Sequence, residues 1–599
     1  MATTAVPETK SAGPAAAARV DWHRLAPPSV RRAYRKGKDS KGWAAWVKHL
    51  AGRRRPVPLE KLLPDRRPLR WALPPAAESQ GTPEILSRLE RLDTKRSAVE
   101  LQELAAEWMA EPPGDLPEPG WAVEALSWSH ALPKLSASLG PDLWWKLLDC
   151  LLDAVADGGR LDLDRHPLAH QLIAGELAVT LGCLFPEINA CRKAGRSGRR
   201  ALSLGLVELT DGEGFIHGAH IDLVRPLLAC WTRCRALGDA LVRGCWNKKA
   251  EIQYKWLVRH ALRLARHDGS HVLARDSAGT RCDGLLSASL ELAGDRNDWN
   301  IAAVALPGGK KTSQAARARL PKPAYHSPWG MTGVLRAGWS RDDARLVVVY
   351  ADDRVRLELE SAAGVLLSGV WDLDVRLDGR RLEPASEWSE VCWLSDRDID
   401  YLELELELSD GITVQRHIAL AREDRFAFLA DAVVGGPPQA IEYRGLLPLG
   451  GAVEFRAANK TREGLLAAKK PAALVLPLAL PEWRIDPRGG TLDTSDGSLE
   501  LRQSAHAAAL WAPLFIDLAP RRFRRPLTWR QLTVAENLRV QPPDVAVGYR
   551  LQVGKQQWLI YRSLAAKDNR TLLGHNLVSE LLIARFRKDG EVETLVEIE

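Results

Sequence analysis

The spacing of apolar residues changes once along this chain of 599 residues, and this change limits the fold more than any other feature. Before about residue 330, apolar side chains recur every three to four residues, as in 84–109, 141–152, 166–185, 226–242 and 251–266. After it they recur every two residues, which is the period of a β-strand. The sequence therefore predicts an all-helical first part and an all-β second part.

The clearest strand pattern lies at 401–408, where Leu and Glu alternate. Ser409-Asp410-Gly411 is typical of a turn, and the alternation resumes at 412–420. We predict an antiparallel hairpin with Leu on the dry face and with Glu403, Glu405 and Glu407 on a solvated face. Asp-Gly pairs at 378, 496 and 589 predict further turns.

A segment rich in Pro, Gly and Lys separates the two patterns and is typical of a linker. We predict a basic, partly disordered arm at 1–75, a helical toroid-like domain at 76–305, a linker at 306–332 and a β-sandwich at 333–599. The expected fold class is α+β multidomain, in which an all-α, α/α toroid-like domain precedes an antiparallel β-sandwich.

Positive charge is concentrated at the N-terminus. Residues 1–70 hold 17 Lys and Arg against 5 Asp and Glu, whereas the whole chain carries only +7. Two interpretations stay open, a polyanion-binding arm and a solvated tail. We expect the arm to add salt-sensitive binding to polyanions without being needed for the fold. No specific nucleic-acid motif accompanies it.

No run reaches the roughly 18 uncharged apolar residues of a membrane span, and the first residues lack the apolar core of a signal peptide. We expect no membrane span, and a location that is cytoplasmic or unknown. Cys230 and Cys234 stand one helical turn apart, but a metal pair would need two more ligands. We predict buried reduced thiols, no metal and no cofactor.

Four stretches between about 140 and 450 share features with one family. They are 170–187, which ends in a Phe-Pro-Glu corner, 208–225, which contains Asp211-Gly212, and the strand-like 333–340 and 416–433. Together they resemble the heparinase II/III-like polysaccharide lyases. The resemblance implies β-elimination on uronate-containing glycans: a base removes the C5 proton, a polar or cationic group stabilises the carboxylate, and an acid, often Tyr, protonates the leaving oxygen.

The resemblance also implies a site, from which this sequence departs twice. The family's catalytic Tyr falls on His220 or Ile221, and its β-domain His falls near 352–357, where no His stands. We therefore assign His220 as base or acid, because His titrates near neutral pH, and His217 as its helper.

The expected substrate-binding residues are His170, Arg225, Asp222 and His166. His166 and His170 stand at i,i+4 on one helix face. Asp222 either orients His220 or marks a helix start, and Arg225 either holds a carboxylate or caps a neighbouring helix.

Three functions stay open. The first is a polysaccharide lyase whose partner is an acidic polysaccharide. The second is a catalytically inactive relative that binds acidic glycans or serves as a scaffold, which the missing Tyr and His favour. The third is a hydrolase on the same helical toroid, which would need two carboxylates facing each other across a cleft.

Overall fold

The computed structural model describes residues 20–53, 59–63, 67–73, 81–91, 98–111, 118–239, 241, 244–274, 283–309, 319–486 and 489–599. It divides into two compact units. Unit 1 comprises Met1–Ile216, Leu223–Ala261 and Arg275–Asp295, and unit 2 comprises His217–Asp222, Leu262–Ala274 and Arg296–Glu599. Three short segments of the helical half, 217–222, 262–274 and 296–305, thus belong to the unit that holds the sheets. The domain boundaries given above stay predictions, and Gly308 and Gly309 are described whereas Lys310 and Lys311 lie outside the described residues.

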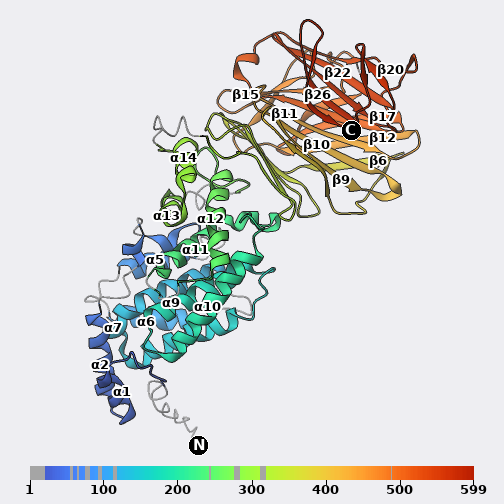
Figure 1. Cartoon of the computed structure of the whole chain (residues 1–599). Coiled ribbons are helices and arrows are strands. Elements are labelled where there is room, and N and C mark those ends of the chain that lie inside the picture. The colour runs from blue at the N-terminus through green and yellow to red at the C-terminus, as the bar shows by residue number, and fades with distance from the viewer. Residues whose placement is uncertain are drawn as a thin grey trace, which may run out of the picture. The chain divides into compact units, whose positions relative to one another are not determined.

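The described residues up to Ala305 form helices and turns, as Figure 1 shows. The helices are α1 Pro28–Arg35, α2 Asp39–Gly52, α3 Leu59–Leu62, α5 Thr82–Arg91, α6 Ala98–Ala110, α7 Pro119–Gly158, α8 Pro167–His170, α9 Ala178–Leu184, α10 Asn189–Glu208, α11 Val224–Gly238, α12 Lys248–Arg263, α13 Asp283–Ala293 and α14 Arg296–Ala305. Shorter helical turns are η2 Pro68–Arg70, η3 Gln171–Leu177 and η4 Gly218–Leu223. In their described residues, the five sequence stretches with helical spacing lie mostly on helices; 92–97, 240 and 242 lie outside the described residues.

The N-terminal helices are built into the helical core. The Trp22 ring lies 5.0 Å from that of Trp46 and 5.9 Å from that of Trp145 on α7, centroid to centroid. Trp46, on α2, is fully buried and also meets Trp144. The expectation that 1–70 is dispensable for the fold is therefore wrong for 20–53. Charge dominates the composition of that stretch, but its buried aromatic residues decide its packing.

The chain just before α1 pairs with a distant segment of unit 1. Trp22 forms an isolated antiparallel bridge with Ile188, His23 N donates to Glu187 O at 2.8 Å, and Asn189 N donates to Asp21 O at 3.0 Å. These backbone hydrogen bonds hold residues 21–23 beside the start of α10.

One helical stretch, Pro167–Leu184, is long and apolar enough to cross a membrane by length and composition. It is 94% buried within the protein, as is usual for a core helix. Among the described residues no other helix meets that test.

Strands follow from Tyr325 onward, and all their pairings are antiparallel. They are β1 Tyr325–Ser327, β2 Thr332–Arg336, β3 Arg345–Val349, β4 Arg356–Ser361, β5 Gly364–Val370, β6 Asp372–Leu377, β7 Arg380–Arg381, β8 Ser389–Ser395, β9 Ile399–Glu407, β10 Thr413–Ala421, β11 Phe426–Val434, β12 Gln439–Pro448, β13 Glu454–Ala457, β14 Gly464–Ala467, β15 Pro471–Pro477, β16 Gly490–Ser495, β17 Ser498–Ala507, β18 Leu510–Asp517, β19 Leu527–Leu532, β20 Val534–Glu536, β21 Arg539–Val540, β22 Ala546–Val553, β23 Gln556–Ser563, β24 Arg570–Leu572, β25 His575–Leu577, β26 Leu581–Phe586 and β27 Val592–Ile598. The predicted order, a helical part followed by antiparallel β-structure, is confirmed.

The sheets stack on both sides of a central one. That sheet has eight strands in the order β13-β14-β15-β18-β11-β10-β9-β8. One of its faces packs on the sheets β1-β2-β3-β4-β5 and β16-β17-β12-β6-β7, and the other packs on β19-β22-β23-β26-β27. A fifth sheet, β21-β20-β24-β25, packs against the outer side of the last one. Both faces of the central sheet are therefore dry.

The predicted hairpin is confirmed as β9 and β10, but its predicted solvated face is wrong at Glu403. This residue is 1% exposed, because the sheet β19-β22-β23-β26-β27 covers the face of β9 on which it lies. Tyr401 Oη donates to Glu403 Oε2 at 2.6 Å, and His417, its cross-strand partner, lies 3.6 Å away. Glu407, at the end of the strand, is exposed as expected.

Candidate functional site

The segment His217–Asp222, which we call the histidine loop, is anchored to the sheet of β2 and β3 within unit 2. Gly218 N donates to Gly330 O at 2.8 Å. A Cβ at Gly218 would lie 2.8 Å from Val349 Cγ1 and 2.9 Å from Thr332 Oγ1, so only glycine fits this approach. His271 Nε2 donates to the backbone carbonyl oxygen of Ile221 at 2.9 Å, which fixes the other end of the loop.

Two half-buried imidazoles and one exposed indole gather on the histidine loop and the neighbouring β1–β2 turn. The His217 and His220 rings are 6.3 Å apart, centroid to centroid. His217 meets the Trp329 ring edge-on at 5.2 Å, and Trp329 is 47% exposed. His217 Nδ1 accepts from Ala219 N at 3.2 Å, so the neutral ring carries its proton on Nε2. An exposed indole beside groups that transfer protons suits a sugar ring.

Asp222 pairs with an arginine that the sequence analysis did not single out. Arg356 Nη1 lies 3.0 Å from Asp222 Oδ2, and Arg356 Nη2 donates to Gly218 O at 3.1 Å. Arg356 stands in 352–357, where the family resemblance placed a missing His. The resemblance thus pointed to the segment that contacts the histidine loop, although a cation stands there in place of an imidazole.

The remaining predicted residues belong to unit 1. His170, the last residue of α8, is 6% exposed, shares a 3.0 Å hydrogen bond with Gln171 Nε2, and has its pKa lowered by burial. His166 precedes α8 with φ −132°, so the expected shared helix face with His170 is wrong. Arg225 is the second residue of α11 and is 2% exposed. The structure thus brings together His217, His220 and Asp222 in unit 2.

No protein-family model matches this chain, and no curated protein does. Solved structures do. A crystal structure of heparinase III matches with a TM-score of 0.64 and 12% identity, over 91% of this chain and 99% of that one. The fold is that of heparinase III. A heparinase III gene product matches at 0.62 and 13%, over 90% and 98%. A heparan sulfate lyase mutant from Pedobacter heparinus matches at 0.55 and 11%, over 92% and 99%.

Within this heparinase III fold, the β unit holds a His–Tyr–Glu cluster that the sequence analysis missed. His326 Nε2 lies 2.9 Å from Tyr350 Oη and 3.2 Å from Glu390 Oε2, and its ring stacks on Trp393 at 4.9 Å. Burial lowers the pKa of His326 to about 4 and raises that of Tyr350 and of Glu390.

This cluster is not part of the histidine loop. Side chains alternate along a strand, so His326 and Tyr350 lie on the opposite face of the sheet from Thr332 and Val349, which contact Gly218. Gly333, on the face of the cluster, leaves room for the Trp393 ring. The cluster is largely buried: Tyr350 is 2% exposed and the His326 side chain 5%, whereas the Glu390 side chain, on the edge strand β8, is 24% exposed. It therefore does not replace the catalytic Tyr that the sequence lacks.

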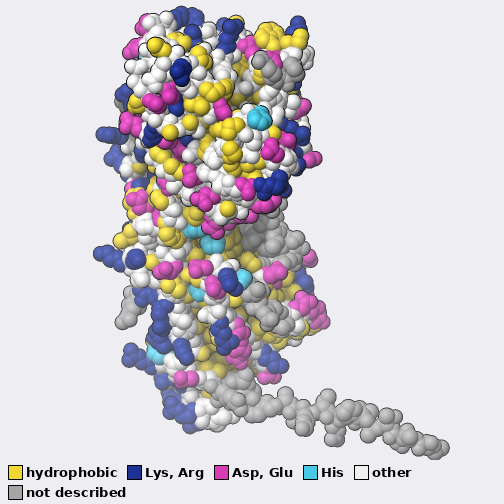
Figure 2. Space-filling view, turned by 90° about the vertical axis from the view of Figure 1, so that its right-hand side faces the viewer, with side chains coloured by type: hydrophobic (Ala, Val, Ile, Leu, Met, Phe, Trp, Pro, Cys, Tyr) yellow, Lys and Arg dark blue, Asp and Glu magenta, His cyan; other side chains and the backbone are white. Residues whose placement is uncertain are grey.

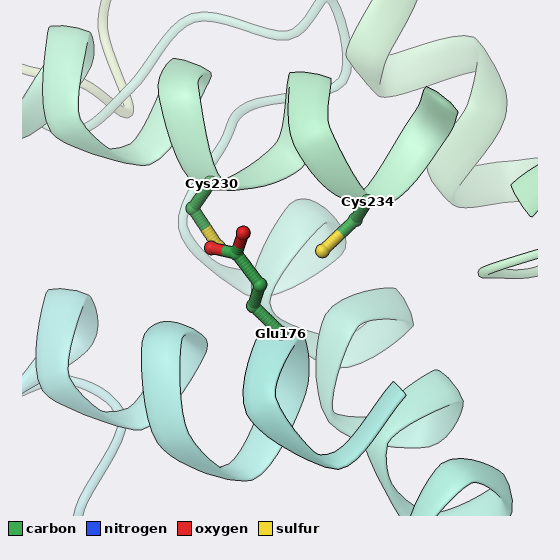
Figure 3. A group of neighbouring side chains, drawn as sticks. All are labelled: Glu176, Cys230 and Cys234. Carbon is green, nitrogen blue, oxygen red and sulfur yellow. The ribbon is translucent and has the colours of Figure 1, made fainter. Parts of the chain in front are cut away.

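Figure 3 shows three buried donor groups in unit 1, with Glu176 reaching from η3 toward Cys230 and Cys234 on α11. Their ligand atoms lie within 4.8 Å of one another. Both oxygens of Glu176 accept from Arg233, at 2.6 and 2.8 Å. Burial raises the pKa of both thiols, which keeps them protonated at neutral pH.

The donor set therefore fits a buried ion pair lined by two thiols better than a metal centre, which needs thiolates and a carboxylate that is not already paired. The described cysteines are all free thiols, as predicted, and Cys282 lies outside the described residues.

Proposed function

We propose that this protein is a polysaccharide lyase that acts on acidic, uronate-containing glycans by β-elimination. The histidine loop carries the proposal, because it offers two imidazoles beside an exposed indole in a chain whose fold is that of heparinase III over nine-tenths of its length. His220 serves as the base or acid, and His217 assists it. Each ring can exchange a proton near neutral pH.

One cation lies against this loop. The Arg356 guanidinium contacts Asp222 at 3.0 Å, Asp352 at 3.7 Å and Gly218 O at 3.1 Å. Such a fork can hold a uronate carboxylate as charge moves onto it in the transition state. His170, Arg225 and His166 remain candidate substrate-binding residues of unit 1.

A second candidate is a catalytically inactive relative that binds acidic glycans. The observation that favours it is the burial of Tyr350, which is 2% exposed, and of the His326 side chain, which is 5% exposed. In that case the histidine loop would bind a sugar without moving a proton.

The two candidates differ in one product. Elimination leaves a 4,5-unsaturated uronate that absorbs in the near ultraviolet, so turnover of a panel of uronate polymers, heparan sulfate included, can be followed directly. We expect an increase in absorbance with at least one polymer. His220→Ala should lose about two decades of rate or more, the usual scale for a lost proton-transfer group.

The matched control is His506→Ala, which removes an exposed histidine from β17 of the same unit and should leave the rate unchanged. Binding without absorbance across the whole panel would reject the lyase and favour the inactive relative.

A further inference from the structure

A groove of about 960 Å³ runs along one side of α10 within unit 1. Helix α9 contributes Val179 and Gly182, and the far wall comes from Leu241, Gly244, Asn247 and Lys249. The wall is tied to α10, because Asn247 N donates to Ser203 Oγ at 3.0 Å and Arg199 Nη2 donates to Trp246 O at 3.0 Å.

Positive charge dominates this α10 groove. Five cations line it, and one carboxylate, Glu208, accompanies them; the cations are Arg192, Arg196, Arg199, Arg200 and Lys249. None of the five forms an ion pair with a carboxylate among the residues that the structure describes. By contrast, the buried Arg233 of the same unit pairs with Glu176 at 2.6 Å. Unpaired cations that converge on a hollow attract a polyanion.

Helical spacing produces this row of charge. Arg192, Arg196 and Arg200 stand four residues apart, and Arg199 stands three residues after Arg196, which places them on one side of α10. At 1.5 Å per residue the row is about 12 Å long, so it can meet several anionic groups of one extended ligand. Figure 2 shows Lys and Arg side chains, in dark blue, gathered along the left-hand edge of the helical unit.

The floor of the groove is backbone. Gly182 and Gly195 face each other where α9 crosses α10, and a Cβ on Gly182 would lie 2.8 Å from the Gly195 Cα. The two glycines thus let the helices touch and keep the groove open above the contact. Leu204, which is 48% exposed, and Val207 add apolar surface between the cations.

We propose that the α10 groove binds an acidic polysaccharide through its sulfate or carboxylate groups. The inference rests on the proposed function for the choice of ligand and adds a binding site that the histidine loop does not contain. Guanidinium forks fit sulfate and carboxylate groups in pairs of hydrogen bonds. Asn247, which is exposed at the far wall, offers its side-chain amide to sugar hydroxyls. Among the described residues, no aromatic side chain lines the groove, whereas grooves that bind single-stranded nucleic acid combine cations with stacking rings.

The test is the binding of a defined sulfated oligosaccharide of heparin to the full chain, measured by calorimetry at several salt concentrations. Arg196→Ala with Arg200→Ala removes two exposed guanidiniums from the groove. The control, Lys146→Ala with Lys193→Ala, removes two exposed cations of the same unit that lie outside it, one of them on α10 itself. We expect the groove variant to bind at least about tenfold more weakly and with less salt dependence, and the control to bind as the unchanged chain does.

Equal losses in the two variants would overturn the proposal, as would unchanged binding in both. A single-stranded DNA oligonucleotide of equal charge serves as the competing ligand. If it binds the unchanged chain as tightly as the oligosaccharide does, and if the groove variant weakens its binding to the same degree, the assignment to a polysaccharide is overturned. The readout needs no turnover. If the protein yields no unsaturated product but the groove variant still loses binding, the proposed binding site is therefore supported and the proposed lyase activity is rejected.

Discussion

At the scale of single residues, burial fixes the protonation of His326. Its pKa of about 4 lies below the value near 6.5 expected in the unfolded chain. Between these values the unfolded chain binds a proton that the folded chain excludes. The contribution of His326 to stability is therefore complete above pH 6.5 and is lost as the pH falls toward 4.

We predict that His326→Gln makes the free energy of unfolding less dependent on pH in this window, by up to about 1.4 kcal/mol per pH unit. Urea unfolding at several pH values between 4 and 7 measures this slope. Glu390, whose pKa burial raises, acts with the opposite sign but is present in both proteins. His506→Gln, at an exposed position, should keep the original slope. Equal slopes for the two variants would contradict the prediction.

At the scale of the element, α7 is one long helix broken at a single glycine. Gly140 has φ 72° and ψ 170°, a conformation that only glycine adopts readily, and Pro141 restarts the helix behind it. No atom lies within 4 Å of a Cβ built there, so the cost of a side chain is one of backbone conformation alone.

We predict that Gly140→Ala lowers the free energy of unfolding by about 1–3 kcal/mol. Gly52→Ala is the matched change, because this glycine ends α2 with ordinary helical backbone and equally open space. It should be neutral or stabilising by up to about 1 kcal/mol. Thermal unfolding followed by the helical circular dichroism signal compares the two. A loss of the same size in both would show that the break in α7 is not the cause.

Elements were predictable from the sequence where one period repeats long enough. The Leu and Glu alternation at 401–408 identifies β9 and shows that the strand has an apolar and a polar face. It does not show which elements cover either face. Glu403 is buried because β23, more than 150 residues later in the chain, brings Arg562 to within 3.9 Å of its carboxylate. The burial of a polar face therefore depends on partners that the local pattern does not contain.

At the scale of the whole molecule, the chain crosses between its units several times. Leu262–Ala274 leaves the helical half and joins unit 2, where Arg266 donates to both oxygens of Glu358, at 2.9 and 2.6 Å. Glu358 is fully buried and also accepts from Leu273 N at 2.7 Å. The sheets therefore depend on a segment that precedes them by about fifty residues.

We predict that a fragment spanning 319–599 is less stable than the same sheets in the full chain, by several kcal/mol, because Glu358 loses the bonds from Arg266 and from Leu273 N and keeps Arg345, at 3.6 Å, as a cation partner. Thermal unfolding of the fragment, followed by near-ultraviolet circular dichroism, measures this. Glu358→Gln should raise the melting temperature of the fragment and lower that of the full chain. A fragment that melts as the full chain does would contradict the prediction.

The candidate sites were less predictable than the fold. The order of helices and strands follows from the change of period, and the histidine loop was predicted because the family resemblance places the catalytic Tyr at His220 or Ile221. Arg356 could be placed beside that loop only through the family resemblance, since 134 residues separate it from Asp222. The spacing of the arginines at 192–200 predicts that they share one helix face. The sequence analysis instead predicted polyanion binding from the net charge of 1–70. The groove itself depends on α9, on Leu241 and on 244–249, which no local pattern brings together.

The bridge between Trp22 and Ile188 sets an order of events during synthesis of the protein. The ribosome makes Trp22 and Trp46 early, but their partners on α7 and at 187–189 follow up to roughly 170 residues later. At 5–20 residues per second this delay lasts roughly ten to thirty seconds, longer than a helix needs to form. For that time the nascent chain carries exposed indoles on a strongly basic segment. A chaperone that recognises basic and aromatic stretches therefore has its best opportunity before residue 190 emerges.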